Sequence, residues 1–158
     1  MLSDGNVIYT YDGSFEGFLT CVHQSFYCRE NPADIVPEQA CQPTLFTVKY
    51  VAADAQKAQR VYDSIVDKIS LQAQNTVRFA FLTCLPQKEL YLLLYLRLGY
   101  KVGSKLTRML GNEIVSTVNN AVKSMKNEAH LLKGFLRFQD YDGALVAVRS
   151  PKNFVLPL

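Results

Sequence analysis

The stretch Leu90–Leu98 constrains the fold most, because it is apolar on every side except at Arg97. As a helix it would have no polar face, and a helix of this kind usually forms the buried centre of an α-rich layer. Its longest uncharged run is the seven residues Leu90–Leu96, far short of the ~20 that a membrane-spanning helix needs. We therefore expect no membrane span, but a folded domain around a helix that begins at Pro86 and ends at Gly99.

Other segments repeat apolar residues every three or four positions, which is the spacing of one helix face. Ser14 and Asp54 are placed to cap two such helices, and a further helical segment ends near Leu85. The longest pattern begins after Asn112, with apolar positions at Ile114, Val118, Val122, Met125, Ala129 and Leu132. Together with the apolar helix, these patterns predict about five helices.

The two ends of the chain carry the β-strand patterns. Residues 6–11 and 45–51 alternate as strands, whereas 31–43, with three prolines, reads as a loop. Residues 135–138 and 144–149 are expected to form a hairpin. Strands at both ends with helices between them predict an α+β domain, with a small, mostly antiparallel sheet of about four strands packed against the helices.

The net charge of +3 is unevenly distributed. Residues 1–86 carry 6 Lys and Arg against 9 Asp and Glu, a net −3, and residues 87–158 carry 11 against 5, a net +6. A one-sided basic segment favours a polyanionic partner such as nucleic acid. A solvated helix face would give the same pattern, so charge alone leaves both interpretations open.

Much of the positive charge follows one side of the longest predicted helix. Its members, three or four residues apart, are Lys123, Lys126, His130 and Lys133. They lie away from the apolar positions of that helix. We expect Gly134 to end the helix, so that Lys133 and Arg137 flank a tight helix-to-strand corner. This basic stripe and corner are predicted to contact the phosphates of a nucleic acid.

His130 and Glu128 are the candidate catalytic residues. An imidazole at the basic stripe could accept a proton or bond a phosphate ester, and Glu128 could orient a reacting group. A solvated histidine and a structural glutamate would look the same. Gly-rich phosphate loops and the common metalloprotease and hydrolase motifs are absent. We therefore expect no cofactor and no bound metal.

Tyr9, Tyr11 and Arg97 complete the candidate nucleic-acid-binding residues. The two tyrosines share one face of the first strand, where paired aromatic rings can stack unpaired bases, although such pairs more often pack a sheet. Arg97 lies near the end of the apolar helix, where the helix dipole favours a cation. We expect Arg97 to have a structural role; if its side chain lies in a cleft, it would bind an anion instead. His23 is assigned no role.

Cysteine usage indicates the compartment. The chain has four cysteines, Cys21, Cys28, Cys41 and Cys84. No two of them form a C-x2-C pair, so a zinc finger is not expected. The first residues show neither a basic segment nor an apolar core of a secretory signal. We expect free thiols in a cytoplasmic protein.

Four motifs occur in order along the chain. They are Y-T-Y-D-G-S-F-E-G-F-L at 9–19, Y-L-R-L-G at 95–99, E-A-H-L-L-K-G-F-L-R-F at 128–138, and N-F-V-L-P-L at 153–158. On these motifs the sequence resembles the uncharacterised bacterial family of DNA metabolism proteins that carries a domain of unknown function, DUF4130. The resemblance implies one domain over residues 1–158 that lacks a C-terminal extension found in related chains.

The resemblance also implies a setting in DNA repair or nucleic-acid metabolism. Members of the family accompany a radical-SAM protein, and some are fused to a uracil-DNA-glycosylase-like domain. Three functions therefore stay open: a nucleic-acid-binding accessory domain, a DNA-processing enzyme that uses His130 and Glu128, and an interaction module for the radical-SAM partner. Nucleic-acid binding that weakens with salt would favour the accessory domain. Loss of activity on replacing His130 would favour the enzyme, and co-purification with the radical-SAM protein at high salt would favour the interaction module.

Overall fold

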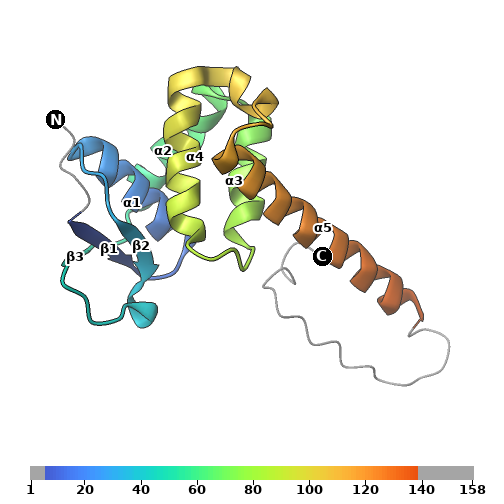
Figure 1. Ribbon diagram of the computed structural model, residues 1–158, viewed down its shortest axis with the longest axis horizontal. Coiled ribbons are helices and arrows are strands. Elements are labelled where there is room, and N and C mark those ends of the chain that lie inside the picture. Colours follow the sequence, from blue (N-terminus) through green and yellow to red (C-terminus); the bar gives the residue numbers. More distant parts are fainter. Residues whose placement is uncertain (1–5, 139–158) are drawn as a thin grey trace.

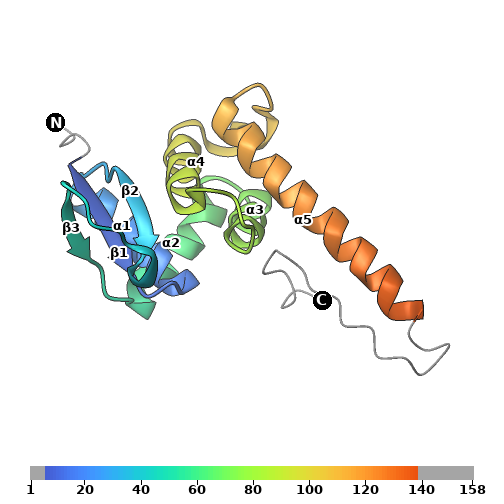
Figure 2. The ribbon, with the colours of Figure 1, turned by 60° about the horizontal axis from the view of Figure 1, so that its bottom comes forward.

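A small sheet lies at one side of the molecule and a group of helices lies beside it (Figure 1). The computed structural model describes the backbone of residues 6–138 and the side chains of residues 6–132. In chain order the elements are β1 (Val7–Tyr11), α1 (Phe15–Tyr27), β2 (Asp34–Pro37), η1 (Glu38–Ala40), β3 (Thr47–Tyr50), α2 (Ala55–Lys68), α3 (Leu71–Phe81), α4 (Lys88–Val102), η2 (Gly103–Arg108) and α5 (Glu113–Phe138). Helix α5 leads away from the other helices (Figure 2).

The described sheet has three strands in the order β2-β1-β3, and all of them are parallel. Tyr9 of the central strand pairs with Ile35 of β2 and with Lys49 of β3. The prediction of a mostly antiparallel sheet of about four strands is therefore wrong. Helix α1 carries the chain back across the sheet, so β2 starts from the same edge as β1 and runs in the same direction. Strand β2 lies inside the proline-rich stretch that reads as a loop in the sequence, with Pro37 at its end on an edge strand.

The helix-to-strand corner expected at Gly134 does not exist, because α5 continues through Gly134 to Phe138. The prediction of a strand at 135–138 is therefore also wrong. One glycine inside a helix costs only about 1 kcal/mol, which packing elsewhere in a long helix easily offsets. Four residues are also too few for their alternation to identify a strand. The other half of the expected hairpin, 144–149, lies outside the described residues.

Helix α4 is the buried centre of the fold, as its sequence predicts. Leu92, Leu93 and Leu96 are fully buried. The helix contacts β2 on one side and α2, α3 and α5 on the others. It therefore joins the sheet to the helical part. Among the described helices, none combines the length and apolar character of a bilayer span.

The N-terminal caps predicted at Ser14 and Asp54 are confirmed. The Ser14 hydroxyl accepts a hydrogen bond from the Gly17 amide at 2.9 Å. A carboxylate oxygen of Asp54 accepts from the amides of Gln56 at 3.0 Å and Lys57 at 3.1 Å. Each side chain satisfies backbone donors that the first turn of a helix leaves unpaired. These contacts depend on neighbouring residues alone, which is why local sequence predicts them.

Gly99 lies inside α4 and does not end it. The helix continues to Val102, and Gly103, with φ of 65°, follows at its C-terminal end. A Cβ atom at Gly99 would lie 2.5 Å from Ile69 Cδ1 and 2.8 Å from Leu106 Cδ2. The glycine is needed because two apolar side chains occupy the space that any larger residue would fill.

Replacing Gly99 with alanine is expected to lower the free energy of unfolding by about 1 kcal/mol. Overpacking costs about 1–3 kcal/mol, and the better helix propensity of alanine offsets about 1 kcal/mol of it. Urea unfolding at 25 °C measures the difference. Gly111→Ala is the matched control and should be nearly neutral, because no atom lies within 4 Å of the place that its methyl group would take. A Gly99→Ala protein at least as stable as the wild type would contradict the packing argument.

Candidate functional site

A cavity of about 710 Å³ lies between α3 and α5, and two residues of the predicted basic stripe line it. Lys123 and Lys126 are both exposed on α5. The other lining residues are Leu71, Gln72, Asn75, Thr76 and Phe79 of α3, and Asn119, Val122 and Asn127 of α5. None of these side chains is acidic. We call this cavity the α3–α5 groove; Figure 2 shows the two helices that form it.

The groove follows from how the two helices pack. On α5, Val118, Val122 and Met125 are buried, and on α3, Ala73 and Val77 are buried. These positions share one face of each helix, and the two helices are in contact. Residues one position away from a buried face lie at its border, so the lysines and amides stand along the edge of the contact.

The groove presents positive charge, amide groups and one aromatic ring. Lys126 Nζ lies 4.8 Å from the centroid of the Phe79 ring, a cation–π distance. Within the described part of the chain, the ion pairs are Lys49 with Glu30 and Lys57 with Asp54. Neither groove lysine therefore forms an ion pair with a described residue.

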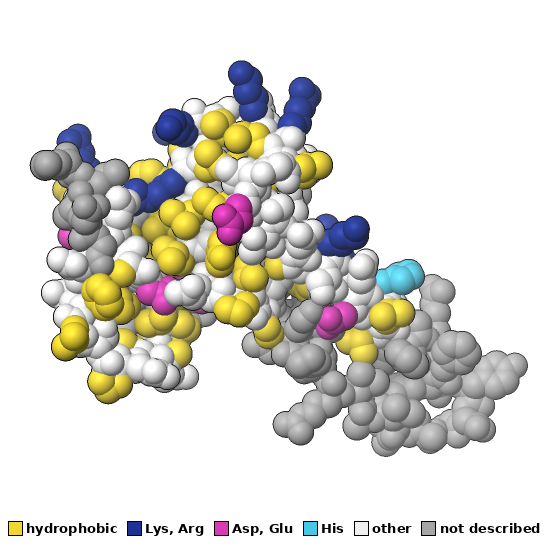
Figure 3. Space-filling model, in the orientation of Figure 1, with side chains coloured by type: hydrophobic (Ala, Val, Ile, Leu, Met, Phe, Trp, Pro, Cys, Tyr) yellow, Lys and Arg dark blue, Asp and Glu magenta, His cyan; other side chains and the backbone are white. Residues whose placement is uncertain are grey.

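His130 and Glu128 lie on the same helix but do not line the groove. His130 is exposed, whereas Glu128 is half-buried and has an interaction partner. Figure 3 shows basic side chains over the middle of α5 and a histidine side chain farther along it. Lys133 and Arg137 belong to the last turns of α5, where side chains are not described. All five positions lie on α5, and among those with described side chains Lys123 and Lys126 line the groove.

Tyr9 and Tyr11 are in the core, away from the groove. Their hydroxyls donate hydrogen bonds to the carboxylates of Glu30 and Glu89 respectively, the second at 2.7 Å. Burial, followed by these carboxylate contacts, raises the pKa of both phenols above its ordinary value. Both rings are almost completely buried, so neither offers a face to a base.

Arg97 also lies away from the groove, where it holds the segment after α1. One Nη donates to Ser25 Oγ at 3.1 Å and to the Glu30 carbonyl at 2.6 Å, and the other donates to Asn31 Oδ1. The guanidinium carbon stands 5.2 Å from the centroid of the Phe26 ring. Burial lowers the pKa of Arg97 below its ordinary value. These contacts match the structural role expected of Arg97 from its place near the end of the helix.

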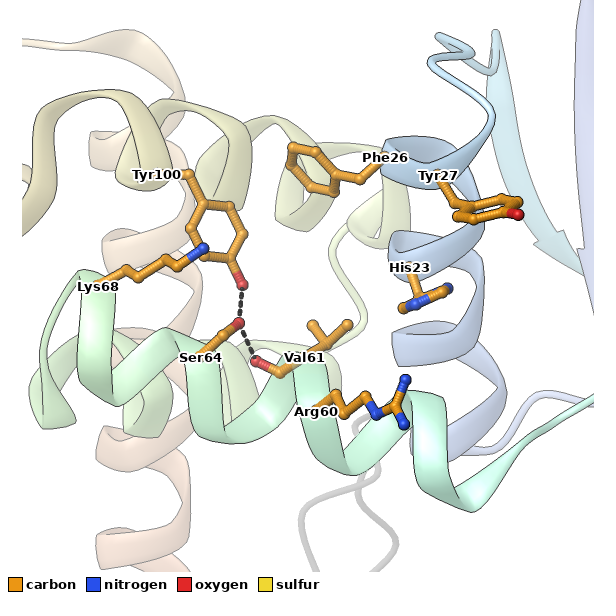
Figure 4. Close-up of a pocket in the computed structure, with 8 residues that line it drawn as sticks. All are labelled: His23, Phe26, Tyr27, Arg60, Val61, Ser64, Lys68 and Tyr100. Carbon is orange, nitrogen blue, oxygen red and sulfur yellow. Dashed lines mark hydrogen bonds between the residues drawn. The ribbon is translucent and has the colours of Figure 1, made fainter.

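A second cavity, of about 550 Å³, lies among α1, α2 and α4 (Figure 4). Its lining residues are His23, Phe26, Tyr27, Arg60, Val61, Ser64, Lys68 and Tyr100. Sequence reasoning missed it because three helices that are distant in the chain supply its walls. One local signal was present: Arg60, Ser64 and Lys68 follow one another at intervals of four on α2.

The described residues offer free thiols but no cluster that could hold a metal ion. The four cysteines form no disulfide. Burial raises the pKa of the Cys21 thiol to about 12, which keeps it protonated and unreactive at neutral pH. Residues 6–138 contain no group of three or more His, Cys, Asp and Glu side chains arranged to hold a metal ion.

Comparison with known proteins adds one match. No curated protein and no solved structure matches the chain. Residues 86–158 match the family model for a domain of unknown function, DUF4130. The matched segment begins just before α4 and includes Arg97, Lys123 and Lys126. Residues 86–158 are therefore similar to the DUF4130 domain, in a match that covers less than half of the chain.

Proposed function

We propose that this protein binds single-stranded nucleic acid in the α3–α5 groove. The observation that carries the proposal is the composition of the groove. It joins two lysines that form no ion pair with any described residue to four amide side chains and an aromatic ring. Phosphates would lie against Lys123 and Lys126, since contacts of this kind supply most of the affinity for nucleic acids.

The amide groups of the groove favour a strand whose bases are exposed. Gln72, Asn75, Asn119 and Asn127 each offer both a donor and an acceptor. Base edges present the same combination, and unpaired bases leave those edges accessible. The half-buried Phe79 ring adds an apolar surface beside Lys126. A solvated helix face would need none of these groups around its lysines.

The wider role rests on the family resemblance. It supports a function in DNA metabolism or repair, in the cytoplasm and together with a radical-SAM protein. Lys123 and Lys126 lie inside the matched DUF4130 segment, which supports a connection between the groove and that role. An enzyme that uses His130 and Glu128 has less support, because neither residue lines the groove.

Replacing Lys123 and Lys126 with glutamine is expected to weaken binding of a fluorescein-labelled 20-nucleotide single strand about tenfold or more. Each phosphate contact adds about 0.7 to the slope of log affinity against log salt, so the double variant should lose about 1.4. Fluorescence anisotropy between about 50 and 200 mM salt measures both quantities.

The matched control is the double variant Lys101→Gln/Lys105→Gln, which removes two exposed lysines outside the groove. It should retain most of the wild-type affinity. Equal losses in the two double variants would show that net charge alone attracts the strand. Unchanged affinity in the Lys123/Lys126 variant would rule out the groove as the binding site.

A further inference from the structure

We propose that the cavity among α1, α2 and α4 binds a small phosphorylated ligand with a planar ring, of the nucleoside monophosphate class. Its volume of about 550 Å³ falls in the range of about 300–1,000 Å³ in which proteins bind small molecules. No residue lining it also lines the α3–α5 groove. The proposal therefore stands independently of the proposed nucleic-acid function.

The charge of this cavity favours an anion. Arg60 and Lys68 stand two turns apart on α2, and no lining side chain is acidic. Neither cation takes part in an ion pair with any described residue. Helix α2 also carries Asp63 and Asp67, and Asp63 accepts a hydrogen bond from Gln59 at 2.8 Å. Both positive charges thus remain available to a ligand.

His23 marks the end of the cavity where the anion would lie. Its Nδ1 is buried and has no hydrogen-bond partner among the described residues. A buried polar atom without a partner costs free energy, which a ligand or water would recover if a small rotation of the ring brought Nδ1 to the cavity. Figure 4 shows the His23 imidazole and the Arg60 guanidinium on the same side of the cavity. Together they form a pair of groups suited to a phosphate.

Aromatic side chains provide the surface for a planar ring. Phe26 is 41% exposed and Tyr27 is 80% exposed, although both border the cavity. Phe26 and Tyr100 meet edge to face, with ring centroids 5.3 Å apart. Exposed rings beside cations are the arrangement that stacks nucleobases next to their phosphates.

The floor of the cavity leaves one acceptor open. Ser64 donates its only hydroxyl proton to the Val61 carbonyl at 2.8 Å, so Tyr100 must donate in the 2.6 Å bond between the two hydroxyls. The Tyr100 oxygen then keeps a lone pair for an N–H of the ring. Lys68, with Nζ 5.8 Å from the Tyr100 ring centroid, stands at this end of the cavity. The ring would lie over Val61, between the Tyr100 end and the phosphate end.

The test compares AMP and UMP with adenosine and inorganic phosphate by isothermal titration calorimetry. Both monophosphates are expected to bind, and AMP should bind at least tenfold more tightly than adenosine or inorganic phosphate. Arg60→Gln should weaken AMP binding about tenfold and leave adenosine binding unchanged. Tyr100→Phe should weaken AMP and adenosine by the same factor, because it removes only the acceptor for the ring N–H. Arg60 is exposed and Tyr100→Phe keeps the aromatic ring, so the fold should be kept.

Several results would overturn the proposal. Absence of AMP and UMP binding would show that the cavity is not a nucleotide site. Inorganic phosphate binding as tightly as AMP would remove the role of the ring, and unchanged AMP affinity in Arg60→Gln would place the ligand elsewhere. The Lys123→Gln/Lys126→Gln protein should bind AMP normally, and Arg60→Gln should bind the single strand normally. Failure of one proposal is therefore distinguishable from failure of the other.

Discussion

Replacing Arg97 with methionine is expected to lower the free energy of unfolding by about 2–4 kcal/mol. The substitution keeps much of the apolar stem but removes every donor of the guanidinium. Ser25 Oγ, the Glu30 carbonyl and Asn31 Oδ1 all lose a charge-assisted hydrogen bond. Removing a partly buried charge recovers some desolvation free energy, which is why the expected loss is smaller than the sum of three bonds.

The loss should be concentrated where α1 ends. Arg29 has φ of 54°, a conformation that costs a non-glycine residue free energy. Arg97 contacts the residues on both sides of it, Glu30 and Asn31 directly and Phe26 through its ring. Hydrogen exchange at residues 28–31 should therefore become faster in Arg97→Met, in addition to the lower stability in urea unfolding.

Two further variants serve as comparisons for Arg97→Met. Arg97→Lys retains the charge but cannot place donors on three acceptors at once, so its stability should lie between those of the wild type and Arg97→Met. Lys101→Met changes an exposed cation in the same helix and should be within about 0.5 kcal/mol of wild type. If Arg97→Met matched Lys101→Met, the contacts of Arg97 would contribute little to the fold.

Replacing Tyr11 with phenylalanine is expected to lower the free energy of unfolding by about 2–3 kcal/mol, because it leaves a buried carboxylate without its hydrogen-bond donor. Glu89 is only 6% exposed and accepts the Tyr11 hydroxyl at 2.7 Å. Replacing both partners with apolar residues should lower the free energy of unfolding by less than the sum of the two single substitutions. Urea unfolding of Tyr11→Phe, Glu89→Leu and the double variant should give a coupling free energy of about 1–2 kcal/mol. Tyr50→Phe, at an exposed tyrosine of β3, is the control and should be neutral.

The same contact predicts a dependence on alkaline pH. Burial and the Glu89 carboxylate raise the pKa of Tyr11. The folded state therefore keeps the phenol protonated where the unfolded chain ionises it. The stability contributed by this difference is fully present below about pH 10 and is lost as the pH rises. Between about pH 9 and 11, Tyr11→Phe should lose less stability than wild type. A parallel decline in the two proteins, or a coupling near zero, would contradict the role of the Tyr11–Glu89 bond.

The candidate site could be predicted only in part. The spacing of Lys123 and Lys126 placed them on one helix side, and the structure shows both along the α3–α5 groove. The amides of α3 that complete the groove come from about fifty residues earlier in the chain, and no local pattern connects them to α5. The cavity with His23 was missed for the same reason, because its walls come from α1, α2 and α4.

The sequence by itself determined where helices form, which face of each is apolar, and how two of them begin. Those properties depend on residues within a turn or two of one another, such as Ser14 with Gly17 and the apolar positions of α4 and α5. Strand direction, the uninterrupted course of α5 through Gly134, and the need for glycine at Gly99 were decided only in the tertiary structure. Each depends on contacts between residues that are distant in the chain, or on the balance between a small local cost and packing elsewhere. The same holds for Arg97, whose three hydrogen-bond partners lie 66 to 72 residues away in the chain. Through these contacts Arg97 stabilises the segment after α1.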